Sequence, residues 1–192
     1  LINIQNQAQS IREDIFSCTL VFAHQWDPDL EEGNSRELRT KLVDDIKKHQ
    51  WKAAQILPHV LTALEIVPKH IFNLFMDTDE TPGSSRYSSP KYQKIERIYA
   101  SSVGSSGFLG LLLSMLKIDV GMDVLVIGAC GYAESLVSQL VGPRGKVTVV
   151  DTLKPHIDMF RTLMRQIAPH RNIKYHRVDN YVSGIQNKVE VL

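Results

Sequence analysis

Two different hydrophobic periodicities alternate along the central stretch of the chain, residues 123–151. A continuous apolar run, Val124 to Ile127, ends at the glycine turn Gly128-Ala129-Cys130-Gly131. The apolar residues that follow recur at helical spacing: Leu136, Val137, Leu140 and Val141. A Gly-Pro-Arg-Gly break then precedes a second apolar run, which ends on Asp151. This order predicts strand, glycine turn, helix and strand, the first half of a doubly wound nucleotide-binding sheet.

The alternation continues after Asp151. The helical spacing of Ile157, Phe160, Leu163, Met164 and Ile167 predicts another amphipathic helix, which Pro169 would stop. Residues 173–178 alternate as a third strand that closes on Asp179 and Asn180, and residues 189–192 look like the start of a fourth. We therefore expect an α/β fold with a mostly parallel, three-layer, Rossmann-like sheet. An open sheet that stopped there would leave an unprotected edge, so we expect the sequence to be incomplete.

The N-terminal part has a different character. Residues 1–35 are polar and mixed, which indicates an extension and linker ahead of a domain over residues 36–192. Ser35 suits the N-cap of a helix from Arg36, with an apolar face of Leu38, Leu42, Val43 and Ile46. A second helix is expected over residues 53–64, ending before Val67-Pro68.

Two segments are rich in small residues, and the first of them is predicted as a loop. Residues 77–92 form a long Gly/Ser/Pro-rich stretch of a kind that is usually functional or disordered. Residues 99–107 lead into an apolar helix expected over residues 108–116. Such a lead-in is typical capping sequence, and it also suits an anion-binding or backbone-docking site.

Composition excludes several classes of function. The chain has 192 residues, 43% of them hydrophobic, and a formal net charge of +1, as expected for an ordinary domain without an electrostatic footprint for nucleic acid. Its two cysteines provide no disulfide framework, so we expect a reducing compartment such as the cytoplasm. No apolar run approaches the ~20 residues of a membrane span. The first residue is Leu rather than Met, so we expect the true N-terminus, and any targeting segment, to be missing.

Candidate chemistry centres on Asp151. It follows the first glycine of the turn by about 20 residues, the spacing at which an acidic residue accepts hydrogen bonds from ribose hydroxyls. Asp179 suits either a ligand contact or an ordinary turn. Cys130 has no basic neighbour in sequence and is expected to pack rather than react. The histidines show no metal-ligand spacing.

Three stretches together resemble the protein-L-isoaspartate (D-aspartate) O-methyltransferases. The first is the helical lead-in of residues 38–72, which ends Val67-Pro68-Lys69-His70-Ile71-Phe72. The second covers residues 116–151, including the segment 141–147, Val-Gly-Pro-Arg-Gly-Lys-Val. The third is Arg177-Val178-Asp179-Asn180, in the place of the family's Gly-Asp-Gly. Together the three stretches span about residues 36–192, most of the chain, and the lead-in is the more diagnostic part.

The resemblance implies an S-adenosylmethionine-dependent enzyme that methylates a carboxylate of a protein or peptide. The turn Gly128-Ala129-Cys130-Gly131 would line the methionine and ribose part of the cofactor. Asp151 would hold the ribose hydroxyls, while Asp179, next to Asn180, would bind the adenine amino group. Ser102 or Ser105 would take the place of the serine in the substrate motif. Catalysis in such an enzyme is mostly alignment, because the methyl donor is already activated and a carboxylate is already a nucleophile.

Departures from the family pattern leave other functions open. The glycine turn is one residue short, Val126 replaces an acidic residue, and Gly104 stands in the register of the substrate-motif serine. The alternative is a catalytically inactive methyltransferase-like domain that serves as a structural or adaptor subunit of a larger assembly. A nicotinamide-dependent oxidoreductase fits less well, because the glycine spacing suits it poorly and no Tyr-x-x-x-Lys pair is evident.

Overall fold

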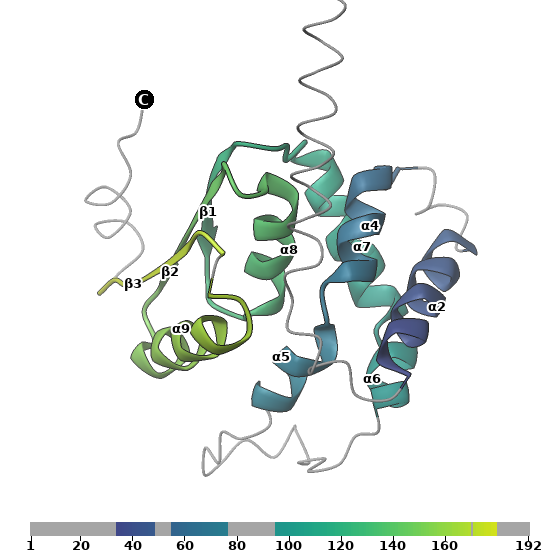
Figure 1. Cartoon of the computed structure of the whole chain (residues 1–192), viewed down its shortest axis with the longest axis horizontal. Coiled ribbons are helices and arrows are strands. Elements are labelled where there is room, and N and C mark those ends of the chain that lie inside the picture. The colour runs from purple at the N-terminus through teal and green to yellow at the C-terminus, as the bar shows by residue number, and fades with distance from the viewer. Residues whose placement is uncertain (1–33, 49–54, 77–94, 170, 180–192) are drawn as a thin grey trace, which may run out of the picture. The chain divides into compact units, whose positions relative to one another are not determined.

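The computed structural model describes residues 34–48, 55–76, 95–169 and 171–179 (Figure 1). These residues form two compact units, which are described separately. The first unit contains residues 119–129, 137–169 and 171–179 of the described chain, and the second contains residues 34–48, 55–76, 95–118 and 130–136. The predictions for residues 1–33, for the loop 77–92 and for the fourth strand at 189–192 lie outside the described residues.

The first unit is built on a parallel three-stranded sheet in the order β1-β2-β3. Its strands are β1 (Asp123–Ile127), β2 (Lys146–Asp151) and β3 (Ile173–Arg177). In the register, Val149 of the central strand pairs with Val126 on one side and Tyr175 on the other. Val147, Val149 and Val150 are fully buried, as expected for the middle of a parallel sheet. The predicted α/β fold and the three strands predicted within the described residues are confirmed.

Two helices connect the strands: α8 (Tyr132–Val141) follows β1, and α9 (Lys154–Ile167) follows β2. The helix α9 packs on β2 and β3. Its buried stripe consists of the residues predicted from their spacing: Ile157, Phe160, Leu163, Met164 and Ile167. Pro155 stands in its first turn, where the missing N–H costs nothing.

The apolar run of β1 is less buried than its composition predicts. Val124, Leu125 and Val126 are half-buried, and Ile127 is 55% exposed. A continuous apolar run is typical of a buried strand, and β1 departs from that expectation. The reason is position, because β1 forms an edge of the sheet among the described residues, while β2 has a neighbour on each side.

The second unit is helical. It contains α2 (Ser35–Lys48), α4 (Pro58–Ile66), α5 (Lys69–Met76), α6 (Ile95–Ser101) and α7 (Val103–Met115). The helix α2 packs against α4, α6 and α7 and buries Leu42, Val43 and Ile46 as predicted. It begins at Ser35 itself, so Ser35 is not the N-cap. The Asn34 carbonyl accepts the Leu38 N–H at 3.0 Å instead.

The second helix begins later than its apolar pattern predicts. Residues 55–57 are not helical, and α4 starts at Pro58. Leu57 is extended, and its N–H donates to the Ser114 hydroxyl of α7 at 3.0 Å. A hydrogen bond between residues so far apart in sequence cannot be read from local periodicity.

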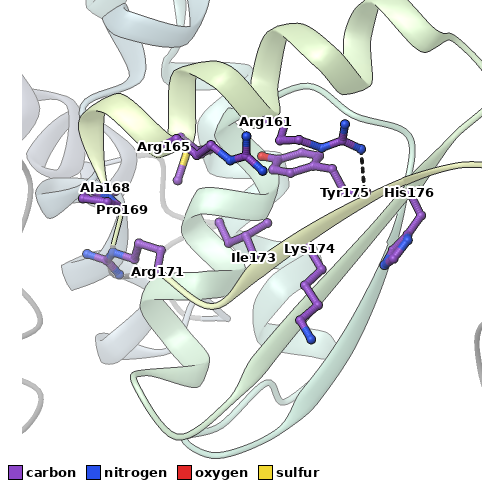
Figure 2. Close-up of a pocket in the computed structure, with 10 residues that line it drawn as sticks. Arg161, Arg165, Ala168, Pro169, Arg171, Ile173, Lys174, Tyr175 and His176 are labelled. Carbon is purple, nitrogen blue, oxygen red and sulfur yellow. Dashed lines mark hydrogen bonds between the residues drawn. The ribbon is translucent and has the colours of Figure 1, made fainter.

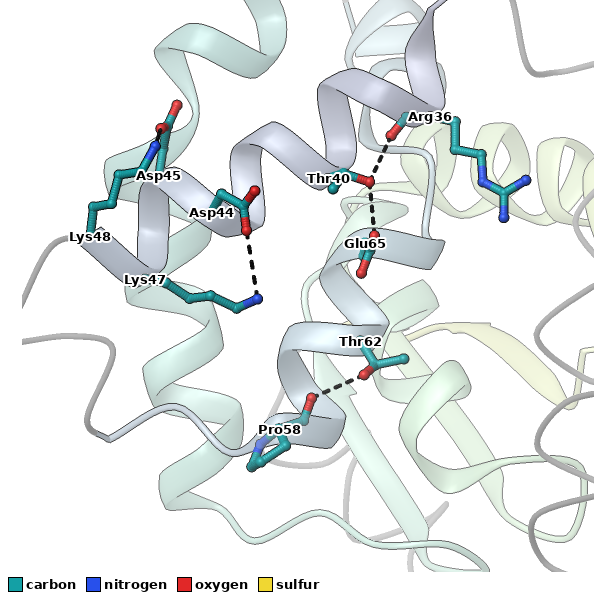
Figure 3. Close-up of polar contacts among 9 residues, drawn as sticks. All are labelled: Arg36, Thr40, Asp44, Asp45, Lys47, Lys48, Pro58, Thr62 and Glu65. Carbon is teal, nitrogen blue, oxygen red and sulfur yellow. Dashed lines mark hydrogen bonds and ion pairs between the residues drawn. The ribbon is translucent and has the colours of Figure 1, made fainter.

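Polar side chains connect α2 to α4 (Figure 3). Thr40 Oγ1 donates to Glu65 Oε1 at 2.8 Å, and the buried Arg39 donates from Nε to the Glu65 carbonyl at 2.7 Å. The Lys47–Asp44 and Lys48–Asp45 pairs lie on the exposed side of α2 and contribute little to stability.

The small-residue stretch 99–107, expected to lead into a helix at residue 108, is itself largely helical, which corrects the expected start of that helix. The helix α6 ends at Ser101 and α7 begins at Val103. Serine hydroxyls donate back to carbonyls of the preceding turn, from Ser102 to Ile98 and from Ser105 to Ser102. Gly110 permits close packing, since a Cβ there would lie 3.1 Å from Leu64 Cδ1 and 3.5 Å from Ile56 Cδ1.

Among the residues that the structure describes, no single helix has the length and apolar composition needed to cross a membrane. The helices α6 and α7 meet those criteria only as a pair, which is bent by 58° at their junction.

The packing of α7 predicts unequal effects of the same substitution at two glycines. Gly110→Val should lower the free energy of unfolding by about 1–3 kcal/mol, because the branched side chain overpacks the contact with Leu64 and Ile56. Gly104→Val is the matched control, since a Cβ at Gly104 meets nothing within 4 Å. Urea unfolding measures both variants, and equal losses would contradict the packing described here.

Candidate functional site

Asp151, at the carboxyl end of β2, connects two turns of the first unit. The residue is only 4% exposed. Its Oδ2 accepts the Ala129 N–H at 2.8 Å, and its Oδ1 accepts the Leu153 N–H at 2.8 Å. One carboxylate therefore ties the start of the glycine turn to the turn that leads into α9.

These hydrogen bonds keep Asp151 ionised. Burial by itself raises the pKa of this carboxyl. The amides of Leu153 and Ala129, with His156 Nδ1 3.7 Å away, lower the pKa by more than burial raises it, so it lies below its usual value. A carboxylate has about four acceptor positions, and the two amides use two of them. The remaining positions suit hydroxyl donors such as those of a ribose.

Gly128 makes the backbone beside Asp151 approachable. Its φ is 92°, a left-handed value that favours glycine, and its N–H donates to the Val150 carbonyl at 2.8 Å. A Cβ at this position would meet nothing within 4 Å, so the turn is open on that side. The structure thus brings together Gly128, Ala129 and Asp151, three of the residues predicted to hold a cofactor.

The second half of the turn belongs to the other unit and has its own carboxylate. Glu134, in the first turn of α8, is fully buried. Its Oε1 accepts the N–H groups of Gly131 at 2.7 Å and Cys130 at 3.1 Å. The side chain thus occupies the anion position that the free amides of a helix N-terminus provide.

Sequence reasoning missed Glu134. The signal was an acidic residue three positions after Gly131 at the start of a predicted helix, a spacing typical of N-terminal capping. Burial raises the pKa of Glu134, and the amides of the turn offset only part of that rise.

Cys130 points its sulfur at the same carboxylate. The residue as a whole is exposed, but its Sγ donates to Glu134 Oε2 at 3.4 Å. Burial of the sulfur, with the nearby charge of Glu134, raises the pKa of the thiol to about 12. A thiol that stays protonated is a poor nucleophile, as expected for this cysteine, but the exposed residue is not packed in the core as predicted.

A lysine of the second unit forms a cluster that the sequence did not single out. Lys69, the first residue of α5, donates from Nζ to the hydroxyls of Ser106 at 3.1 Å and Ser105 at 3.3 Å. The same nitrogen lies 5.3 Å from the centre of the Tyr132 ring. Burial lowers the pKa of Lys69 to about 8. It belongs to the Val67–Phe72 segment of the family resemblance, which was the only signal for it.

The two candidate catalytic serines have different surroundings. Ser102 is 4% exposed, and its hydroxyl donates to the Ile98 carbonyl within the helix. Ser105 is exposed and lies beside Lys69. Of the two predicted residues, Ser105 is therefore the one that can meet a substrate.

Of the two residues predicted to lie at the adenine, the structure describes only Asp179. Asp179 follows Val178, whose N–H donates to the Asp151 carbonyl at 2.9 Å. The Asp179 side chain is 93% exposed, and its Oδ1 lies 3.8 Å from Arg177 Nη2. Asn180 lies outside the described residues. Within the described ranges, no three His, Cys, Asp or Glu side chains are grouped as metal ligands.

Several curated proteins with similar sequences are named protein-L-isoaspartate O-methyltransferase. No protein-family model matches the chain. It is 26% identical over 119 residues to the protein-L-isoaspartate O-methyltransferase of Aeropyrum pernix, which covers 62% of this chain and 42% of the relative. The corresponding enzyme of Methanococcoides burtonii is 28% identical over 115 residues, or 59% and 52% of the two chains. That of Methanothrix thermoacetophila is 21% identical over 136 residues, or 70% and 58%.

A solved protein-L-isoaspartate O-methyltransferase has a similar fold. It aligns with a TM-score of 0.51 at 21% identity, over 74% of this chain and 43% of its own. The chain resembles these methyltransferases. The resemblance predicted from the sequence, and the Rossmann-like fold that it implied, are thereby confirmed. The chain spans about half the length of the curated relatives it matches.

The hydrogen bonds of the turn predict that two conservative substitutions differ in cost. In Asp151→Asn, the amide NH₂ must face one of two N–H donors, because each carboxylate oxygen accepts its own. We expect a loss of about 1–3 kcal/mol in the free energy of unfolding. In Glu134→Gln, the single Oε1 can still accept both amides, so the loss should stay below ~1 kcal/mol.

Chemical denaturation at pH 7 measures this difference. Because the pKa of Asp151 is lowered in the folded chain, its stabilising effect is present above its unfolded pKa and fades as the pH falls through the folded value. The Asp151→Asn variant should lack this acid-dependent loss. Equal costs for the two variants would contradict the hydrogen-bonding pattern.

The cluster around Lys69 predicts an amine that titrates early. In ¹³C-dimethylated protein, one lysine resonance should titrate near pH 8, and Lys69→Arg should remove it. The folded pKa lies below the unfolded one, so the contribution of Lys69 to stability rises with pH above about 8. If all lysine resonances titrate near pH 10, the ammonium is not buried as described.

Proposed function

We propose that this protein is an S-adenosylmethionine-dependent methyltransferase that acts on a carboxylate of a protein or peptide. The observation that carries the proposal is the Asp151 carboxylate, ionised at the end of β2 beside a glycine turn whose backbone is open at Gly128. Ligands of open α/β sheets bind outside the carboxyl ends of the strands, where this group lies. The names of the similar proteins point to the same chemistry.

The residues of the first unit fit the cofactor. Asp151 would accept the two ribose hydroxyls at the positions that the Ala129 and Leu153 amides leave open. Gly128 would let the backbone approach closely, since no side chain fills the space beside it. When bound, S-adenosylmethionine supplies an activated methyl group. The amides of Cys130 and Gly131 already bind Glu134, so the methionine end would depend on other contacts.

The second unit offers groups for the substrate. Lys69 has a pKa of about 8, so it is mostly charged at neutral pH, and Ser105 beside it is exposed. An ammonium and a hydroxyl are donors that suit a carboxylate. We propose that they orient the substrate carboxylate, which needs no general base because it is ionised already.

One observation favours the alternative, an inactive methyltransferase-like domain that serves as a structural or adaptor subunit. The polar groups of the turn are satisfied by the chain itself, through Glu134 on the amides of Cys130 and Gly131 and through Asp151 on Ala129 and Leu153. A turn so stabilised keeps its conformation without a ligand. An inactive relative could therefore retain the fold.

Calorimetric titration of the full-length protein with S-adenosylmethionine tests the cofactor-binding part of the proposal. We expect binding in the micromolar range that is weakened at least about tenfold in Asp151→Asn, because hydrogen bonds to a charged acceptor are strong. Asp158→Asn is the matched control, a change of the same kind on an exposed carboxylate of α9. Circular dichroism checks that each variant is folded.

Transfer of a labelled methyl group to an isoaspartyl peptide tests the catalytic part. Ser105→Ala should reduce the rate, whereas Ser101→Ala should not, since the Ser101 hydroxyl donates within its own helix. Binding without transfer to any peptide would support the adaptor function. No binding up to millimolar cofactor would sink the enzyme proposal.

A further inference from the structure

A basic cavity lies at the outer edge of the sheet in the first unit, away from the Asp151 turn in sequence (Figure 2). It has a volume of about 410 Å³ and lies among the second half of α9, the connection that follows it and β3. Its lining includes the cationic side chains Arg161, Arg165, Arg171 and Lys174, and also His176. None of the lining residues is acidic.

The cations approach the cavity from both sides of the strand. Arg161 and Arg165 project from α9 on the side of Tyr175, whereas Lys174 and His176 project from the opposite face of β3 (Figure 2). This follows from the period of two along a strand and from the four-residue spacing on the helix. A ligand at the edge would therefore meet positive charge from the helix and from the strand.

Main-chain groups at this edge are already engaged. Arg161 Nη2 donates to the Tyr175 carbonyl at 2.8 Å, and the Ile173 N–H donates to the Arg171 carbonyl at 2.9 Å. An added peptide strand would have to displace these contacts. Recognition through side chains is thus favoured over pairing with the strand edge.

Arg171 provides a buried positive charge. The residue is 6% exposed, and its Nη2 donates to Gln139 Oε1 at 2.7 Å. Burial lowers its pKa to about 9, which shows that the surroundings disfavour the charged form. The nearest acidic partner on α9, Asp158, is shared between Lys154 and Arg161 and does not line the cavity.

The chemistry of the lining narrows the class of ligand. Three guanidinium groups and an ammonium exceed the charge of a single carboxylate, and the arginine fork matches phosphate oxygens. Met164, Ala168, Pro169 and Ile173 add an apolar wall. The volume suits a small molecule. The net charge of +1 for the whole chain argues against an extended nucleic-acid surface.

We propose that the cavity formed by α9 and β3 binds a small ligand that carries a diphosphate group next to an apolar moiety. This site is independent of the proposed methyl transfer and would serve to hold or sense such a ligand. Arg165 and Lys174, which are both exposed, would contact the phosphates from the helix side and from the strand side of the cavity.

Calorimetry with inorganic pyrophosphate, ADP and a short single-stranded oligonucleotide tests the proposal on the full-length protein. ADP should bind more tightly than pyrophosphate, and Arg165→Gln and Lys174→Gln should each weaken ADP binding by about tenfold, the loss of one charged hydrogen bond. Arg144→Gln is the matched control, an exposed arginine that does not line the cavity, and should change the affinity less than twofold.

Three outcomes would overturn the proposal. Binding only at millimolar concentration would mean an adventitious anion. ADP binding that is equal in all the variants would place the nucleotide elsewhere, for example at the glycine turn. Tighter binding of the oligonucleotide than of ADP would make the surface a nucleic-acid contact. Both test residues are exposed, so loss of folding is not expected to confuse the result.

Discussion

The hydrogen bonds of Asp151 are the interaction on which the sheet and its candidate site both depend. One carboxylate joins the Ala129 amide, 22 residues earlier in sequence, to the turn that starts α9. It therefore orders the loops at the carboxyl ends of β1 and β2 and at the same time becomes ionised. Charge and order have the same cause here, because the amides that shape the loops also lower the pKa of Asp151.

The Glu134 carboxyl, like that of Asp151, accepts two backbone amides, but its pKa is shifted in the opposite direction. It is fully buried and its pKa is raised, although it also accepts two amides. It closes the helix N-terminus that such folds commonly offer to an anion. The contrast bears on the proposed function, since each oxygen of Asp151 accepts a single amide in this structure, while one oxygen of Glu134 accepts both amides at the start of α8.

The local hydrophobic pattern was sufficient to predict the strands of the sheet, but it did not predict where several helices begin. The β-branched runs and the apolar stripe of α9 predicted their elements because burial of those residues is their dominant energy term. The segment 99–107 was expected to precede a helix and is itself largely helical, with the hydroxyls of Ser102 and Ser105 bonded to carbonyls of the preceding turn. The start of α4 depends on the Leu57–Ser114 hydrogen bond, which spans 57 residues.

By itself, the sequence determined the parallel α/β order, the family resemblance, the place of Asp151 and the open glycine beside it. These follow from short-range periodicity and from motif spacing. Only the tertiary structure decided that Ser105 rather than Ser102 is accessible. It also brought Lys69 into contact with Ser105, although the two residues are 36 positions apart in sequence, and it formed the basic cavity beside β3. The physical reason is that burial and pKa depend on neighbours from distant segments, which one-dimensional spacing does not record.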